Sequence, residues 1–377
     1  MVRIVAPKEY VNQPDILNKA GEYISRLGKN ILILGSKKSI EVTKDALFQS
    51  LAKSDISYTL EYFSGYPTLE KAKNYVSRYE NRHIDAIVGI GGGRVIDTSK
   101  VTGTLAKIPV ITIPTIAATC ASWAAVSILY DDNGSFKEIF INDPGPTLIL
   151  ADTKIIINAP VRYTYAGVID TFAKWFEIIP YLNLKKPDAD LMATTDIAKR
   201  AFQLLRDNTF VSIEEAEKGI VSNAAFNTVD SIIFLAGLTG SIKSGNLYYG
   251  IAHTFYNLLS IIVPAPHLLH GEKVAFGLLL QKVIQHAKLS EIDKTIQLFS
   301  EYSALYTLED FGIVSEKQTK RLAEIINNFI QKEYIPGSFI VTEKSIEDAL
   351  YETNNVIHSA LDYQNTIERR FDYAGKN

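Results

Sequence analysis

Short apolar runs alternate with amphipathic segments along the first 150 residues of the chain. The three-to-four spacing of apolar residues in SIEVTKDALFQSLAKS, TLEKAKNYVSRYENR and RVIDTSKVTGTLAK is typical of helices. Continuous apolar runs between such helices are typical of strands buried on both faces. The pattern predicts a doubly wound, mostly parallel, Rossmann-like sheet with helices on both faces. Its expected strands are NILILG (30–35), ISYTLEYF (56–63), IDAIVGI (84–90) and IPVITIP (108–114).

The second half of the chain has a different pattern. After INAPVR (157–162), helical periodicity continues to the C-terminus without strand-like runs of comparable clarity. We therefore expect an α/β domain at 1–160 and an all-α domain at 161–377. The expected helices include YAGVIDTFAKWFEII (165–179), EEAEKGIVSNAAFNTVDSIIFLAG (214–237), NLYYGIAHTFYNLLS (246–260) and GEKVAFGLLLQKVIQHAKL (271–289).

The composition of the chain argues against several classes of function. The 39 Lys and Arg residues against 42 Asp and Glu give a formal net charge of −3, which argues against a nucleic-acid partner. A single cysteine, Cys120, excludes an internal disulfide and a cysteine-rich metal site. The N-terminal residues do not resemble a signal peptide, and no apolar stretch reaches the roughly 20 residues of a membrane span. These observations predict a cytoplasmic protein with no membrane partner.

The glycine-rich stretch GIGGG (89–93) stands between an expected strand and an expected helix. Glycines at such a junction let backbone N–H groups and the positive end of the helix approach an anion such as a pyrophosphate. A tight turn without a ligand explains the same residues, and the two interpretations stay open on this motif alone. The run follows the third expected strand instead of the first, so a standard Rossmann unit does not fit.

The six histidines do not by themselves identify a metal site, because single histidines are usually packed or solvated. In their sequence context, however, the chain resembles the iron-containing (metal-dependent) alcohol dehydrogenases, in particular the glycerol dehydrogenase branch. The likeness runs in order through RIVAPKEYVNQ, GIGGGRVIDTSK, IPTIAAT, SILYDDNG, APVRYTYAGVIDTFAKWFE, AHTFYN and HGEKVAFG. It implies the dehydroquinate synthase-like architecture of that family and a homo-oligomer.

The resemblance places the metal ligands on Asp170, His253 and His270. One carboxylate and two imidazoles leave coordination positions open, as a catalytic Zn²⁺ or Fe²⁺ site requires. Such an ion polarises a carbonyl group, so hydride transfer to or from the nicotinamide needs no strong protein acid. His267 is the expected proton shuttle, with lining of the cleft as the alternative. Ile169 stands where the family usually has glycine.

The resemblance also implies a nicotinamide cofactor. NAD-specific members often carry an acidic residue where this chain has Ser36. Ser36, Lys37 and Lys38 favour the 2′-phosphate of NADP(H), with NAD(H) as the alternative and solvated lysines as the simpler explanation. The pyrophosphate is expected on Gly91, Gly92, Gly93 and Arg94, and the nicotinamide side on Asp97, Thr115, Ala118, Val126 and Tyr130.

Cys120 bears on the substrate, because glycerol dehydrogenases have aspartate at this position. Without that acceptor for a polyol hydroxyl, TCASW resembles relatives that reduce 2-oxo acids to 2-hydroxycarboxylates. We expect a dehydrogenase for a small 2-hydroxycarboxylate or a polyol such as glycerol. The alternatives are an NAD-using lyase or cyclase of the dehydroquinate synthase type, a glycerol phosphate dehydrogenase, and a non-catalytic relative.

Overall fold

The computed structural model describes residues 2–182, 188–243, 250–263, 265, 267–333 and 341–374. They form two compact units. Unit 1 comprises Met1–Trp175 and Pro187–Leu247, and unit 2 comprises Phe176–Lys186 and Tyr248–Asn377. The domain boundary at residue 160 stays a prediction, and the compact units group residues 187–247 with the sheet.

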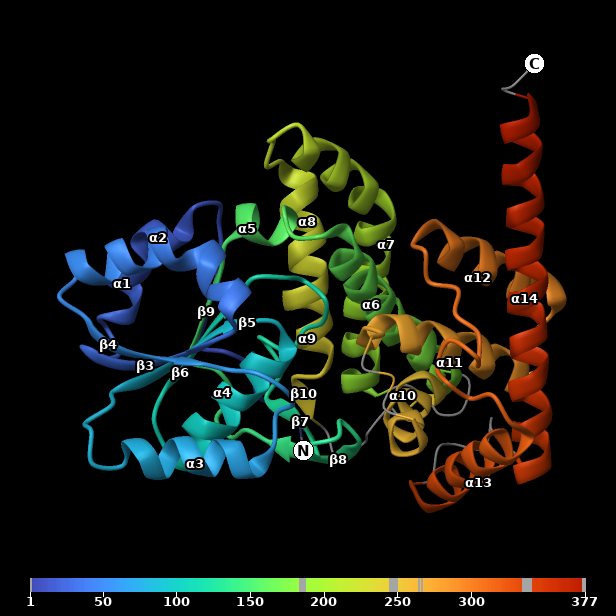
Figure 1. The fold of residues 1–377 in the computed structure, drawn as a ribbon, viewed down its shortest axis with the longest axis horizontal. Helices are drawn as coiled ribbons and strands as arrows, with labels where there is room; N and C mark the ends of the chain where they lie inside the picture. Colours follow the sequence, from blue (N-terminus) through green and yellow to red (C-terminus); the bar gives the residue numbers. More distant parts are fainter. Residues whose placement is uncertain are drawn as a thin grey trace. The chain divides into compact units, whose positions relative to one another are not determined.

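The centre of unit 1 is a six-stranded sheet in which every neighbouring pair of strands is parallel. This confirms the predicted doubly wound architecture (Figure 1). Two of its members, β2 and β9, lie outside the predicted strands. In spatial order the strands are β2 (Glu9–Asn12), β9 (Leu148–Ala151), β6 (Val110–Pro114), β5 (Ala86–Gly91), β3 (Asn30–Gly35) and β4 (Ser57–Tyr62).

The apolar run of β3 is continuous because both of its faces are covered. Ile31 and Ile33 belong to a core cluster with residues of α1 (Ala20–Ile24) and α2 (Lys37–Lys53). Leu32 and Leu34 belong to a second cluster with residues of α3 (Leu69–Tyr79) and α4 (Gly93–Ala106). Figure 1 shows the two helix pairs on opposite sides of the sheet.

Unit 1 also contains two small antiparallel pairs and a set of helices. β1 (Arg3–Ile4) pairs with β10 (Ile242–Lys243), and β7 (Val126–Tyr130) with β8 (Phe136–Ile141). The helices are α5 (Thr153–Ile157), most of α6 (Val161–Leu182), α7 (Ala189–Glu217), α8 (Asn223–Asp230) and α9 (Ala236–Thr239), with a π-helical segment at Ser231–Leu235.

The single helix predicted at 214–237 is wrong. The chain leaves α7 at Glu217, and α8 begins at Asn223. Gly219 adopts φ +75°, a left-handed conformation that ends a helix at little cost for glycine. The hydroxyl of Ser222 then caps α8 by accepting the N–H of Ala224 at 3.1 Å. A turn of five residues therefore interrupts a periodicity that otherwise continues.

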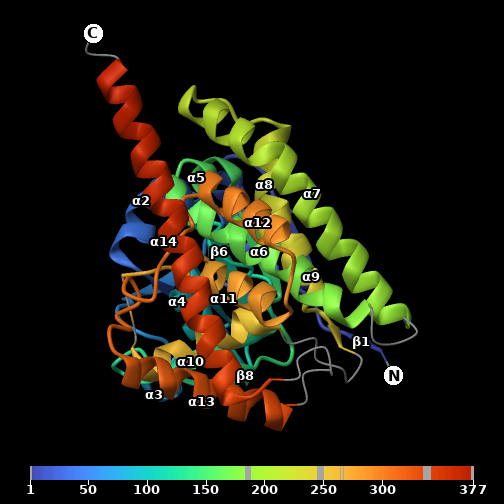
Figure 2. The ribbon, with the colours of Figure 1, turned by 90° about the vertical axis from the view of Figure 1, so that its right-hand side faces the viewer.

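Unit 2 is built from helices around an aromatic core. Phe255 stacks on Phe276 with ring centroids 4.9 Å apart, and both rings contact Phe311. Figure 2 shows α11 and α13 beside the long α14. The helices are α10 (Ile251–Ile262), α11 (His270–Ile284), α12 (Leu289–Glu301), α13 (Glu316–Glu333) and α14 (Glu343–Ala374).

Among the described residues, no helix combines the length and the apolar character that a membrane crossing requires.

Candidate active site

The glycine run forms the junction between β5 and α4. Gly91 ends the strand with φ +148°, a region that L-residues rarely adopt, and Gly92 is the N-cap of the helix that begins at Gly93. A Cβ atom on Gly92 would lie 2.7 Å from Cδ1 of Ile116. The first glycine thus supplies the turn, and the second keeps open the space in front of the helix N-terminus.

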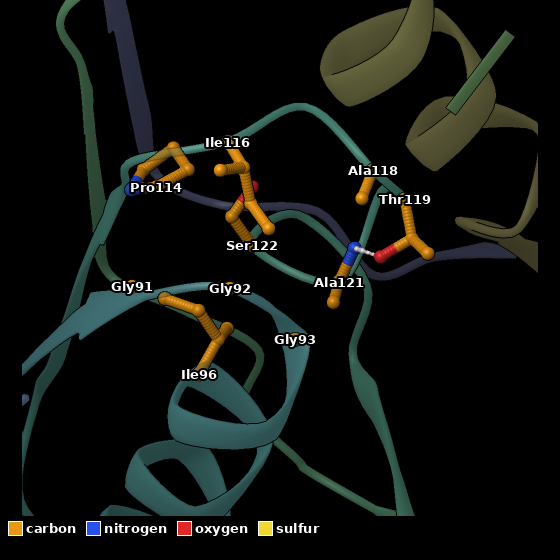
Figure 3. A pocket seen from close by; sticks show the side chains of 10 residues that line it. All are labelled: Gly91, Gly92, Gly93, Ile96, Pro114, Ile116, Ala118, Thr119, Ala121 and Ser122. Carbon is orange, nitrogen blue, oxygen red and sulfur yellow. Dashed lines mark hydrogen bonds between the residues drawn. The ribbon is translucent and has the colours of Figure 1, made fainter. Parts of the chain in front are cut away.

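A small, partly open pocket lies in this space. Figure 3 shows the glycines on one side of it and the loop after β6 on the other. The hydroxyl of Ser122 is buried in its lining and has no hydrogen-bond partner among the residues described. Helix N–H groups and an unpaired hydroxyl suit an anionic group of a ligand. The lining consists of Gly91, Gly92, Gly93, Ile96, Pro114, Ile116, Ala118, Thr119, Ala121 and Ser122.

A buried lysine holds the loop side of this pocket in place. Lys100 of α4 is 1% exposed, and its ammonium group donates to the carbonyl oxygens of Ala121 at 2.8 Å, Ala124 at 2.9 Å and Val126 at 2.5 Å. It also forms a 2.9 Å ion pair with Asp97. Burial raises the pKa of the Asp97 carboxyl, and the charge of Lys100 acts in the opposite direction. Lys100 therefore joins the loop to the helix that follows the glycines.

The remaining predicted cofactor residues lie around this junction. Thr115 donates its N–H to the carbonyl of Gly91 at 3.2 Å. The Arg94 guanidinium lies 4.4 Å from the ring centroid of Tyr66, which also contacts Tyr130. Of the predicted set, the three glycines and Ala118 line the pocket, whereas Asp97 faces Lys100 and Val126 contributes a carbonyl to it.

Ser36 is the N-cap of α2. Its hydroxyl accepts the N–H of Ser39 at 3.1 Å, and the Ser39 hydroxyl in turn accepts the N–H of Ser36 at 2.9 Å. Ser39 also donates to the carbonyl of Ile90, next to the glycine run. Lys37 and Lys38 are exposed on the first turn of this helix. The start of α2 is thus fastened to the end of β5.

Helix α6 lies against the loop after β6 with almost no space between the backbones. A Cβ atom on Gly167 would lie 2.0 Å from the carbonyl oxygen of Ala117. Asp170, 2% exposed, follows one turn later, and its carboxylate is 3.9 Å from the ammonium of Lys174. Gly167 thus brings the helix that carries Asp170 directly onto the loop that lines the glycine pocket.

Cys120 belongs to the same loop and is partly buried. Burial raises the pKa of its thiol, while Lys174 lowers it and Asp170 raises it further. The thiol is therefore neutral at pH 7 and lies in the electrostatic surroundings of both α6 side chains. A neutral, partly buried thiol of this kind is not a reactive nucleophile.

The two histidines predicted as metal ligands belong to unit 2. His253 is on the first turn of α10, and His270 is the first residue of α11. Their ring centroids are 5.4 Å apart, and Tyr256 packs edge-on against His270 at 4.1 Å. Nδ1 of His253 lies 2.5 Å from a carboxylate oxygen of Glu177. His267 is exposed before α11, with Nε2 3.2 Å from the carbonyl oxygen of Asp310.

Sequence reasoning did not find Lys100, Ser122 or Glu177. Lysine and glutamate within an amphipathic helical pattern usually face solvent, and nothing in the pattern marks these two as buried. Ser122 is one of several small polar residues in its loop. Glu177 had a weak signal, since it lies seven residues after Asp170 and therefore on the same face of α6.

Comparison with known proteins identifies the family. The family model described as iron-containing alcohol dehydrogenase matches residues 7–153. A glycerol dehydrogenase of Pseudomonas putida is 30% identical over 360 residues, which is 90% of this chain and 97% of the relative. The chain belongs to the iron-containing alcohol dehydrogenase family. It is a metal-dependent alcohol oxidoreductase that uses a nicotinamide dinucleotide and acts on a small molecule.

Two further members show the range of this alcohol dehydrogenase's relatives. Hydroxycarboxylate dehydrogenase A of Escherichia coli K12 is 28% identical, with 80% of this chain and 82% of the relative covered. The crystal structure of a glycerol dehydrogenase from Schizosaccharomyces pombe superposes with a TM-score of 0.82, at 22% identity over 96% of this chain and 92% of that chain. That structure confirms the fold, and the named relatives are all dehydrogenases, which favours the predicted reaction over the lyase alternative.

Proposed function

We propose that the protein interconverts 2-hydroxycarboxylates and 2-oxo acids. The observation that carries this substrate class is the position of the Lys174 ammonium group. It lies 3.9 Å from the Asp170 carboxylate, and its charge lowers the pKa of the Cys120 thiol. Glycerol dehydrogenases have aspartate at position 120, whereas the thiol here is neutral. A carboxylate at 120 that would repel an anionic substrate is therefore absent, and the ammonium group of Lys174, which also pairs with Asp170, adds a positive charge that suits the carboxylate of a 2-oxo acid. The likeness to hydroxycarboxylate dehydrogenase A supports this choice.

The metal would be held by Asp170, His253 and His270. With N–metal bonds of about 2.0 Å and a tetrahedral angle, two imidazoles on one ion have ring centroids about 5 Å apart. The 5.4 Å between His253 and His270 agrees with this requirement. Asp170 and Glu177 are on one face of the continuous α6, and Glu177 binds His253, which supports Asp170 as the third ligand. Zn²⁺ and Fe²⁺ both accept this donor set.

The reaction then needs little further chemistry from the protein. A bound divalent ion supplies Lewis-acid polarisation of the carbonyl oxygen. The glycine junction would hold the pyrophosphate, and the loop from Thr115 to Val126 would hold the nicotinamide. Lys174 orients the substrate carboxylate, and His267 is the proposed proton shuttle to solvent, consistent with its exposed ring.

Substrate preference tests the role of Lys174. We expect kcat/KM for pyruvate and glyoxylate to exceed that for dihydroxyacetone. Lys174→Met is expected to lower kcat/KM for the 2-oxo acids by about 10–100-fold, because a charged hydrogen bond contributes about 1.5–3 kcal/mol. The uncharged aldehyde glycolaldehyde serves as the control substrate and is expected to change much less.

Cys120→Asp lowers the charge of the same region by adding a carboxylate on the loop instead of removing the ammonium group from the helix. It restores the carboxylate of the glycerol dehydrogenases, so activity with dihydroxyacetone is expected to rise while activity with the 2-oxo acids falls. A wild-type preference for dihydroxyacetone, or an equal loss for charged and uncharged substrates in Lys174→Met, contradicts the proposed substrate class and favours a polyol.

For the cofactor we propose NADP(H), supported by Lys37 and Lys38 on the first turn of α2 and by the absence of an acidic side chain at Ser36. Ser36→Asp is expected to shift the ratio of kcat/KM for NADPH over NADH at least about tenfold toward NADH, because a carboxylate repels the 2′-phosphate and binds the ribose diol. Aspartate is also a good N-cap, so α2 keeps its start. Equal or better efficiency of the wild type with NADH contradicts the proposal.

We also propose a cytoplasmic homo-oligomer. The single cysteine, Cys120, supports a reducing compartment. The resemblance to the family supports the homo-oligomer. Light scattering on the purified protein gives its mass in solution, and a monomer at micromolar concentration contradicts the oligomer.

A further inference from the structure

We propose that Glu177 is a positioning residue that reserves Nε2 of His253 for the metal. The inference rests on the proposed function of His253 as a ligand, and it concerns how one of its two ring nitrogens is selected. Glu177 is on α6 and only 6% exposed, so its carboxylate is not a surface charge.

Both oxygens of the Glu177 carboxylate bind the same residue. Oε2 lies 2.5 Å from Nδ1 of His253, and Oε1 accepts the backbone N–H of His253 at 3.0 Å. The backbone contact fixes the position of the histidine on its helix, and the ring contact fixes the orientation of the imidazole. Because a carboxylate only accepts hydrogen bonds, the Nδ1 position carries the proton. In the neutral imidazole, which is the form that binds a metal, the lone pair is then on Nε2.

The start of α10 is built around this carboxylate. His253 is the third residue of the helix, and its N–H belongs to the first turn, where no helical carbonyl is in reach. The N-cap, Gly250, has no side chain to accept it. A Cβ atom there would lie 2.2 Å from Cγ and 2.3 Å from Oε1 of Glu177. Glycine at this position thus admits the carboxylate as a cap from another helix.

A neighbouring amide holds the same two helices together without contacting the ring. Gln281 of α11 accepts the N–H of Ile251 at 3.1 Å and donates to the carbonyl of Phe176 at 3.1 Å. Gln281 therefore fixes the residue before Glu177 and the residue two positions before His253. This arrangement offers a matched control, since Gln281 supports the helix start but does not touch the imidazole.

The chemical consequence concerns the ligand itself. A metal-binding histidine whose other nitrogen donates to a carboxylate has a fixed tautomer and a more basic ligating nitrogen, and loss of such a partner typically costs 10–100-fold in metal affinity. Glu177→Gln retains the size of the side chain, but it removes the charge and adds an N–H donor. It therefore leaves no carboxylate to define the tautomer.

Two measurements test the role of Glu177. Chelator competition with Zn²⁺ on the full chain is expected to show about 10–100-fold weaker binding in Glu177→Gln. Gln281→Met, which weakens the same helix start, is expected to stay within about threefold of the wild type. The visible spectrum of the Co²⁺-loaded protein is expected to change in Glu177→Gln and not in Gln281→Met. Equal losses in both variants, or none in either, overturn the proposal.

A third measurement does not depend on metal affinity. The tautomer of His253 is measured by NMR in metal-free wild-type protein labelled with ¹⁵N-histidine. Its signal is assigned by its loss in His253→Gln, and we expect the Nδ1–H tautomer. An Nε2–H tautomer or an averaged signal overturns the proposal even where metal binds. A wild type that binds no Zn²⁺ but shows the Nδ1–H tautomer instead contradicts the proposed metal site and leaves the contact to Glu177 in place.

Discussion

Asp170→Asn is expected to lower kcat at least about a thousandfold while the affinity for NADPH changes less than about twofold. Asparagine has the shape of aspartate, but its neutral amide oxygen is a poor ligand for a divalent cation. Without the ion, the developing alkoxide loses the charge that stabilises it. The glycine pocket lies on β5, α4 and the loop after β6, so dinucleotide binding should persist. Steady-state kinetics, metal analysis and NADPH fluorescence titration measure the three quantities.

Asp196→Asn is the matched control for this prediction. Asp196 is an exposed residue of α7 in the same unit, so the same loss of charge is made away from the site. We expect wild-type kinetics and metal content. If Asp170→Asn retains more than about a tenth of the wild-type kcat, Asp170 is not the ligand on which the reaction depends.

Lys100→Met is expected to lower the free energy of unfolding by about 3–5 kcal/mol. The substitution leaves the buried carboxylate of Asp97 without its partner, and breaking a buried ion pair in this way costs that much. Three carbonyl oxygens of the loop also lose their donor. Because this loop forms one wall of the glycine pocket, NADPH affinity should fall as well, by at least about tenfold. Urea unfolding followed by circular dichroism measures the first effect, and fluorescence titration the second.

Lys107→Met is the control for the buried lysine. Lys107 is exposed at the C-cap of the same helix, where methionine takes the same backbone conformation as lysine. Its free energy of unfolding is expected to stay within about 0.5 kcal/mol of the wild type. A loss below about 1 kcal/mol in Lys100→Met would show that water replaces the ammonium group, and that Lys100 does not organise the loop.

Local patterns in the sequence predict the central strands well and the edge of the sheet poorly. The run at 30–35 is visible because both of its faces are buried, and the structure places β3 at those residues. β2 has only four residues, none of them fully buried, and it pairs with β9 almost 140 residues later in the chain. Such a strand is stabilised by its pairing with β9, and four residues are too few to show a strand periodicity in the sequence.

The candidate site was predictable only in part for a related reason. The glycine run has a local signature, since the turn and the helix start follow each other in the chain. The choice of His253 and His270 among six histidines came from resemblance. The contacts of Glu177 and Lys100 join residues 76 and up to 26 positions apart, and no spacing rule covers them. A buried charge is identified by its partners, which only the folded chain brings together.

The contact between Gly167 and Ala117 has a consequence for how this enzyme can change its substrate. The two main chains are in contact there, so the separation between the helix that carries Asp170 and the loop proposed to hold the nicotinamide is set by the backbone and not by side-chain rotamers. Positions 120 and 174, close to this junction, can then exchange thiol, carboxylate or ammonium groups without moving the reacting partners. A change of substrate specificity would thus require different charged groups at these two positions, while the backbone stays unchanged.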